Sequence, residues 1–143
     1  QNDGTGKFKD VTDQYAKGLS KIGFVTNALW YDIDNDGDKD LLLSLEWDGI
    51  IAFINNKGVF TKKVISDKKG FWNFILPCDV NNDGKIDLIA GNLGLNSRLK
   101  ATASQPVRMY YNDFDDNGKK EQVLTYYLNG KELQKKLKNL FDK

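Results

Sequence analysis

Histidine is absent from this chain of 143 residues, and cysteine occurs once, as Cys78. Without histidine there are no Ser-His or Cys-His catalytic pairs, and the commonest general base and the usual zinc ligand are missing. A single cysteine excludes an internal disulfide, so cysteine usage indicates no redox compartment. The apolar neighbours of Cys78 predict a buried, unreactive thiol. The composition therefore favours a protein that is not an enzyme.

A charge excess and a long apolar run are missing as well. Lys and Arg number 21 against 20 Asp and Glu, which leaves a net charge of +1 and no global field for binding nucleic acid or an anionic membrane. No run approaches the roughly 18 apolar residues of a membrane span, and no signal peptide begins the chain. The chain opens directly on a turn at residues 1–8. We therefore expect a piece of a longer protein, and a targeting signal could have been lost with the part that preceded it.

Charge is instead distributed unevenly along the chain. Acidic residues concentrate in three segments, 32–40, 79–87 and 113–121, whereas lysines gather at 62–69 and in the tail from 131 to 143. Carboxylates crowded into nine residues repel one another and need a counter-ion. The tail lysines are expected to form the solvated face of a helix, with no nucleic-acid partner.

Short β-rich runs broken by Gly, Asn and Asp fill most of the chain. The runs at 28–31, 41–45, 50–54 and 59–65 predict a four-strand antiparallel meander. The unit "apolar strand, acidic loop, apolar strand" occurs three times, at a spacing typical of propellers or solenoids. We expect an all-β fold made of such meanders.

The first acidic loop, Asp32 to Asp40, places carboxylates at its positions 1, 3, 5 and 9. Calcium prefers six to eight hard oxygen ligands, and alternating oxygens in a tight loop can surround such an ion. Gly37 supplies the sharp turn, because glycine adopts that backbone conformation without a side-chain penalty. Position 7, Asp38, is expected to bind through its backbone carbonyl alone, and Asp40 to complete the ligand set.

The other two loops repeat this pattern with substitutions. Asn replaces Asp at position 3 of the second loop and at position 5 of the third, and Glu closes the third loop at position 9. Lys85 and Lys119 stand at the carbonyl position. The sequence predicts two to three calcium ions, with the third loop the less regular site. The predicted metal residues are Asp32, Asp34, Asp36, Asp38, Asp40, Asp79, Asn81, Asp83, Lys85, Asp87, Asp113, Asp115, Asn117, Lys119 and Glu121.

Two other interpretations fit the loops less well. An EF-hand begins with the same motif, but it requires a bidentate Glu at position 12 and a helix on each side. Position 12 is Leu43, Ala90 or Leu124 here, and the flanks are β-rich. The alternative is a set of solvated turns without metal, since Asp, Asn and Gly favour turns. Three loops with this spacing of acids favour the metal.

Residues 32–43 and 79–89 resemble the FG-GAP or VCBS repeat, the blade unit of integrin-α-like β-propellers, in which a calcium loop joins two strands. The stretches 91–97 and 106–115 are similar to the large VCBS proteins of Bacteroidetes-type bacteria, which are secreted or surface proteins with ASPIC/UnbV-like extensions. The resemblance implies a β-propeller. Because a ring needs about four blades, we expect a fragment of a larger propeller, or pieces that assemble between chains.

Near the end of the chain the periodicity becomes helical. Leu133, Leu137, Leu140 and Phe141 recur at helical spacing after a possible cap at Asn129. We expect one short amphipathic helix there. The expected segments are the end of a preceding blade at 1–23, a repeat with the first loop at 24–70, a second repeat with the third loop at 71–130, and the helix at 131–143.

The expected function is a non-catalytic, extracytoplasmic interaction module whose partner is a protein or a glycan. A lectin-like role is the first alternative, because Trp47 at an expected hairpin tip and Trp72 at a strand start could stack on sugars, although such tryptophans usually pack in the core. The other alternative is an accessory part of a secreted polysaccharide-acting enzyme. Glu46 is its isolated candidate acid, and an exposed strand-end residue is the simpler interpretation.

Overall fold

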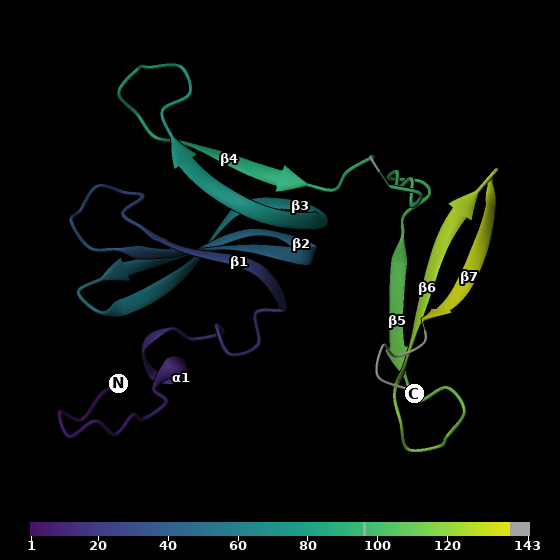
Figure 1. The fold of residues 1–143 in the computed structure, drawn as a ribbon, viewed down its shortest axis with the longest axis horizontal. Helices are drawn as coiled ribbons and strands as arrows, with labels where there is room; N and C mark the ends of the chain where they lie inside the picture. The colour runs from purple at the N-terminus through teal and green to yellow at the C-terminus, as the bar shows by residue number, and fades with distance from the viewer. Residues whose placement is uncertain (96, 138–143) are drawn as a thin grey trace. The chain divides into compact units, whose positions relative to one another are not determined.

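The computed structural model describes residues 1–95 and 97–137 (Figure 1). They belong to two compact units, Gln1–Leu93 and Gly94–Lys143. Both units are built of antiparallel strands, which confirms the all-β prediction. Among the described residues, no helix has the length and apolar character to cross a membrane. The elements are α1 (Thr12–Tyr15), β1 (Phe24–Tyr31), β2 (Asp40–Asn56), β3 (Val59–Cys78), β4 (Asp87–Asn92), β5 (Arg108–Asn112), β6 (Glu121–Leu128) and β7 (Lys131–Leu137).

The first unit is a four-stranded meander in the order β1-β2-β3-β4. The first acidic loop connects β1 to β2 beside the pair Tyr31↔Asp40, and the second connects β3 to β4 beside Cys78↔Asp87. The turn after Asn56 joins β2 to β3. Each loop is therefore the connection of a β-hairpin, and paired strands hold both of its ends.

Strands β2 and β3 are longer than predicted. The runs at 41–45 and 50–54 both lie within β2, and the register of β2 with β3 shifts between Glu46 and Ile51. Trp47 adopts a φ of 67°, and a Cβ at Gly49 would lie 1.9 Å from the backbone oxygen of Ser66. The Asn55 amide donates to Asp40 Oδ1 at 2.8 Å, so the two ends of β2 lie together, whereas an extended strand of this length would hold them about 50 Å apart. The chain therefore reverses direction near Trp47, which confirms the expected hairpin tip.

The core of the first unit lies on both faces of β2. On one face Leu41, Leu43, Leu45 and Phe53 pack with Ala16 of the N-terminal segment. On the other face Leu42, Ile50 and Ala52 pack with Ile75 of β3, and Trp72, Leu88 and Ala90 border this second cluster. A fully buried leucine side chain contributes about 1.5 to 3 kcal/mol. The leucine-rich run after the first loop thus anchors that loop's closing residue.

The opposite face of the β3–β4 hairpin is uncovered in the described chain. Phe74 is 46% exposed, Leu76 52% and Ile89 41%. Leu76 pairs with Ile89, and Phe74 pairs with Gly91, so these apolar residues share one face of the sheet. The hairpin thus has one buried face and one apolar face in solvent.

The second unit is a three-stranded sheet in the order β5-β6-β7. The third acidic loop joins β5 to β6 beside the pair Asn112↔Glu121. Asn129 and Gly130 connect β6 to β7, with φ values of 51° and 77°. Positive φ at both central residues is what a two-residue hairpin turn of the Asn-Gly type requires.

Strand β7 replaces the helix predicted over 131–143. Lys131–Leu137 pairs with β6 from Leu128↔Lys131 to Gln122↔Leu137, so the helix prediction is wrong for these residues. A spacing of four fits a helix face and a strand face alike, and the Asn-Gly turn selects the strand. The predicted Leu140 and Phe141 contacts lie outside the described residues.

Candidate metal centre

The first acidic loop is held by hydrogen bonds from its own backbone to its first carboxylate. Asp32 Oδ1 accepts from the Asp36 amide at 3.1 Å, and Asp32 Oδ2 accepts from the Gly37 amide at 2.9 Å. Asn35 and Gly37 adopt left-handed conformations, with φ of 63° and 94°. The chain therefore curls around the Asp32 carboxylate, and Gly37 stands where the predicted sharp turn occurs.

All three loops share this backbone frame. The carboxylate at position 1 accepts from the amides of positions 5 and 6, the side chain at position 5 accepts from the amide of position 7, and the carboxylate at position 9 accepts from the amide of position 2. Positions 4 and 6 have positive φ in each loop. The corresponding bonds beyond the first loop are Asp83 N and Gly84 N to Asp79, Lys85 N to Asp83, Val80 N to Asp87, Asn117 N and Gly118 N to Asp113, Lys119 N to Asn117, and Phe114 N to Glu121.

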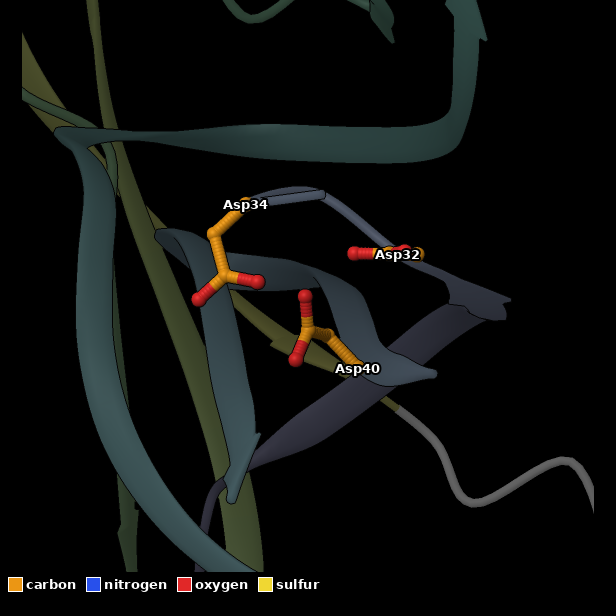
Figure 2. Close-up of side chains that lie close together, drawn as sticks. All are labelled: Asp32, Asp34 and Asp40. Atoms are coloured by element: carbon orange, nitrogen blue, oxygen red, sulfur yellow. The ribbon is translucent and has the colours of Figure 1, made fainter. Parts of the chain in front are cut away.

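Carboxylates from positions 1, 3 and 9 converge in two of the loops. Figure 2 shows the side chains of Asp32, Asp34 and Asp40 directed toward one another, and one oxygen of each lies within 4.8 Å of the others. Asp113, Asp115 and Glu121 form the corresponding group in the third loop. Three carboxylates at this separation supply the oxygen-rich surroundings that calcium prefers.

The side chains at position 5 lie outside these groups. Asp36 Oδ1 accepts from the Asp38 amide at 2.8 Å, and Asn117 Oδ1 accepts from the Lys119 amide at 2.8 Å. The structure therefore gives position 5 a turn-forming bond. For metal binding, Asp36 keeps its second oxygen and Asn117 keeps the second lone pair of Oδ1, so the metal-ligand role of position 5 stays a prediction.

The second loop replaces one carboxylate by an amide. Asn81 Oδ1 accepts from the Asp83 amide at 3.1 Å, and its Nδ2 donates to Asp83 Oδ2 at 3.1 Å. Asp79 and Asp87 keep the positions of Asp32 and Asp40 in the shared frame. An amide oxygen is also a hard ligand, so the second loop offers the same oxygen pattern with one negative charge fewer.

The surroundings of Asp34 in the first loop oppose ionisation of its carboxyl group. The pKa of the exposed Asp34 carboxyl is raised above its ordinary value, first by desolvation and then by the carboxylates of Asp36, Asp40 and Asp32. Within the described residues, no lysine or arginine forms an ion pair with the carboxylates of this loop, and the Arg108–Glu132 pair at 3.5 Å lies elsewhere. A cation in the loop would relieve this repulsion.

Asp40 is fully buried. Its Oδ2 accepts from the Ile33 amide at 2.9 Å, and its Oδ1 accepts from the Asn55 amide at 2.8 Å, near the other end of β2. A buried carboxylate persists only where hydrogen bonds or a cation compensate its lost hydration. The two amides provide part of that compensation, and each oxygen keeps a lone pair for a cation.

Asp38 uses its side chain away from the loop. Its Oδ2 accepts from the Lys57 amide at 2.9 Å in the turn between β2 and β3. The expected metal contacts through the backbone carbonyls of Asp38, Lys85 and Lys119 stay predictions. Sequence reasoning missed the contact to Lys57, and the available signal was an acidic residue in the first loop at a position where the other two loops have lysine.

The residues considered for a lectin or an enzyme function lie in strands β2 and β3, outside the acidic loops. Trp72 borders the core, and its Nε1 donates to the Lys68 carbonyl at 2.8 Å. Trp47 is half-buried and meets Phe71 edge to face, with ring centroids 4.7 Å apart. Glu46 lies next to Trp47 in β2 and is half-buried, so it is less exposed than the sequence suggested. Cys78 is half-buried at the end of β3.

Strands flank each loop on both sides, so the helix-loop-helix structure of an EF-hand is absent from the described loops, as expected.

In comparisons with known proteins, residues 32–90 match the model of the FG-GAP-like repeat. Neither the curated proteins nor the solved structures gave a match. This part of the chain, with its first two acidic loops and the strands between them, is similar to a β-propeller-type repeat module.

Proposed function

We propose that this chain is a calcium-binding repeat module of the β-propeller type, which mediates protein or glycan interactions outside the cytoplasm and performs no catalysis. The observation that carries the proposal is the convergence of Asp32, Asp34 and Asp40 within 4.8 Å. These carboxylates stand on a backbone frame that recurs in the other two loops. Turns that merely expose acids to solvent do not require such convergence.

The donor set suits calcium better than zinc or another soft metal. Every candidate ligand is a carboxylate, amide or backbone oxygen, and the sequence has no histidine. In the first loop Asp32, Asp34, Asp36 and Asp40 would bind through side chains and Asp38 through its carbonyl. The corresponding sets are Asp79, Asn81, Asp83, Lys85 and Asp87 in the second loop, and Asp113, Asp115, Asn117, Lys119 and Glu121 in the third.

The role of the ion would be structural. An ion that binds only the folded state stabilises it by mass action, by about 2.7 kcal/mol per site at a hundredfold excess over Kd. Calcium at extracellular concentrations can occupy sites of modest affinity. This supports a location outside the cytoplasm, where such loops would be filled. Membership of a larger VCBS-type protein with an ASPIC/UnbV-like extension stays a prediction.

The uncovered face of Phe74, Leu76 and Ile89 supports a place within a larger assembly of blades. The other face of the same hairpin already packs on β2, so sheet-on-sheet packing is the established use of this element. We assign a further blade of the same kind to the open face. Such a blade would also cover exposed apolar side chains that are costly to leave in water.

The metal proposal is tested by native mass spectrometry, after dialysis against chelator and then against calcium. We expect two to three bound ions in the unaltered chain. The double variant Asp32→Ala/Asp34→Ala is expected to bind one ion fewer. The control Asp67→Ala removes an exposed acid outside the loops and is expected to bind as the unaltered chain does. An unchanged mass in calcium would contradict the proposal.

A glycan ligand is a second candidate, favoured by the conformation of Trp47. A bulky residue with a φ of 67° is strained, and strain of this kind concentrates at ligand sites. A glycan array probed with the unaltered chain and with Trp47→Ala tests it. Binding that disappears in the variant, while calcium binding persists, supports a lectin role. The absence of binding by the unaltered chain contradicts it.

A further inference from the structure

The first acidic loop is fastened to a hairpin turn that lies 15 to 19 residues further along the chain. Asp38 Oδ2 accepts from the Lys57 amide at 2.9 Å, and Asp40 Oδ1 accepts from the Asn55 amide at 2.8 Å. Asn55 Nδ2 in turn donates to the Lys39 carbonyl at 3.1 Å. Three consecutive loop residues therefore hold the turn between β2 and β3.

The turn depends on this support because of its own sequence. Lys57 and Gly58 form the two-residue connection, with φ values of 52° and 91°. Asparagine or glycine normally occupies the first of these positions, because other side chains destabilise a left-handed conformation. In addition to the hydrogen bonds from the first loop, the turn is stabilised by Asn55 Oδ1, which accepts from the Gly58 amide at 2.8 Å. A hydrogen bond from Lys57 to a charged carboxylate offsets the conformational cost.

The bonds to the turn are compatible with metal binding. A carboxylate accepts up to about four hydrogen bonds or metal contacts through its two oxygens, and Asp40 uses two of these sites for amides. Asp38 gives its side chain to Lys57, which leaves its backbone carbonyl available at position 7. The same residues can thus face an ion on one side and the turn on the other.

The second loop lacks this connection. Its position 7 is Lys85, whose amide donates to Asp83 within the loop. Its closing Asp87 accepts from Val80, also within the loop. Among the described residues, no hydrogen bond joins the side chains of Lys85 or Asp87 to another hairpin. The second loop therefore provides an internal comparison with the same frame and no attached turn.

We propose that the ion in the first loop controls the rigidity of the β2–β3 turn, with Asp38 as the positioning residue that transmits the effect. The inference rests on the proposed calcium function and adds a regulatory role to its first site. Without a cation, the carboxylates of Asp32, Asp34 and Asp40 repel one another at close range. Neutralising that repulsion fixes Asp38 and Asp40, and through them the amides of Lys57 and Asn55.

Amide hydrogen exchange at Lys57 and Asn55, measured by NMR in the whole chain, tests this coupling. In the unaltered chain, calcium is expected to slow exchange at both amides by about tenfold relative to chelator. In Asp38→Ala, exchange at Lys57 should be about five- to tenfold faster even in chelator, since one hydrogen bond is lost. The effect of calcium on exchange at Lys57 should largely disappear in this variant.

Two variants serve as controls for charge and position. Asp38→Asn removes the charge but keeps an acceptor oxygen, so the exchange rate at Lys57 should lie between those of the unaltered chain and Asp38→Ala. Lys85→Ala alters position 7 of the second loop and should leave Lys57 unchanged. Calorimetry on the same samples reports calcium binding separately.

The two proposals fail in different ways. Exchange at Lys57 that is identical with and without calcium, in a chain that releases heat on binding calcium, overturns the coupling alone. Exchange that is unaffected by Asp38→Ala in chelator overturns the positioning role. The absence of any calcium heat contradicts the proposed function and the coupling together.

Discussion

The first and second acidic loops share a backbone frame but differ in their attachment to the fold. In the first loop the closing Asp40 is fully buried, and Ile33 at position 2 borders a core cluster. In the second loop Asp87 is only half-buried, and Val80 at position 2 is 63% exposed. The loop sequence thus determines the local frame, whereas the neighbouring strands determine how rigidly the frame is held.

This difference has a consequence for affinity. A preorganised site loses less conformational entropy when an ion binds, so rigid attachment favours binding. The first loop also has one more negative charge among its side-chain ligands than the second, which has Asn81 in place of Asp34. We therefore expect the first loop to bind calcium more tightly than the second.

The largest expected effect on stability comes from removing the closing carboxylate of the first loop, compared with removing that of the second. Asp40→Ala leaves the amides of Ile33 and Asn55 without their charged acceptor. Bonds to charged groups contribute about 1.5 to 3 kcal/mol each, so the free energy of unfolding should fall by about 3 to 5 kcal/mol. The matched variant Asp87→Ala loses a single hydrogen bond, from the amide of Val80, which is more exposed than those to Asp40. Its free energy of unfolding should fall by about 1 kcal/mol.

Urea denaturation in the presence of chelator measures both variants without a contribution from calcium. Equal losses in the two variants would show that the two loops are attached to the fold in the same way, contrary to the comparison.

An intermediate effect is expected in the third loop, which has Asn117 where the other two loops have aspartate. Asn117→Asp retains the acceptor for the Lys119 amide and adds a negative charge beside the converging acids. Calcium affinity rises with the charge of the ligand set, so Kd should fall by about tenfold. Isothermal titration of this variant beside the unaltered chain provides the measurement. A weaker or unaltered third site would contradict the assignment of position 5 to the metal.

The smallest effect concerns pH. Because the pKa of Asp34 is raised in the folded chain, the folded state binds this proton more tightly than the unfolded state does. In chelator, its contribution to stability therefore falls as pH rises through the raised pKa. Asp34→Asn should match the unaltered chain below the ordinary pKa of aspartate and be more stable above the raised one. Thermal unfolding across the acid range checks this, and parallel curves for the two proteins would contradict it.

Local features of the loops were predictable because they depend on residues close in sequence. The glycines at position 6, the strands that flank each loop and the apolar run Leu41–Leu45 follow from backbone preferences and alternation. The pairing of Asp38 with Lys57 was not predictable in this way, since it joins residues 19 apart that the reversal within β2 brings together.

The error at the end of the chain has a physical origin. The leucine spacing after Asn129 suits a helix and a strand equally, and the two-residue turn together with pairing to β6 decided for the strand. Local propensity was ambiguous there, and contacts with a neighbouring strand determined the outcome.

The central claim is that these nine-residue loops bind a divalent ion, and calorimetric titration of chelator-treated protein with calcium tests it most directly. The account predicts heat that saturates at two to three ions per chain. It also predicts a melting temperature of the first unit about 10 °C or more higher in excess calcium than in chelator. Titration without heat, together with the same melting temperature in calcium and in chelator, would contradict it.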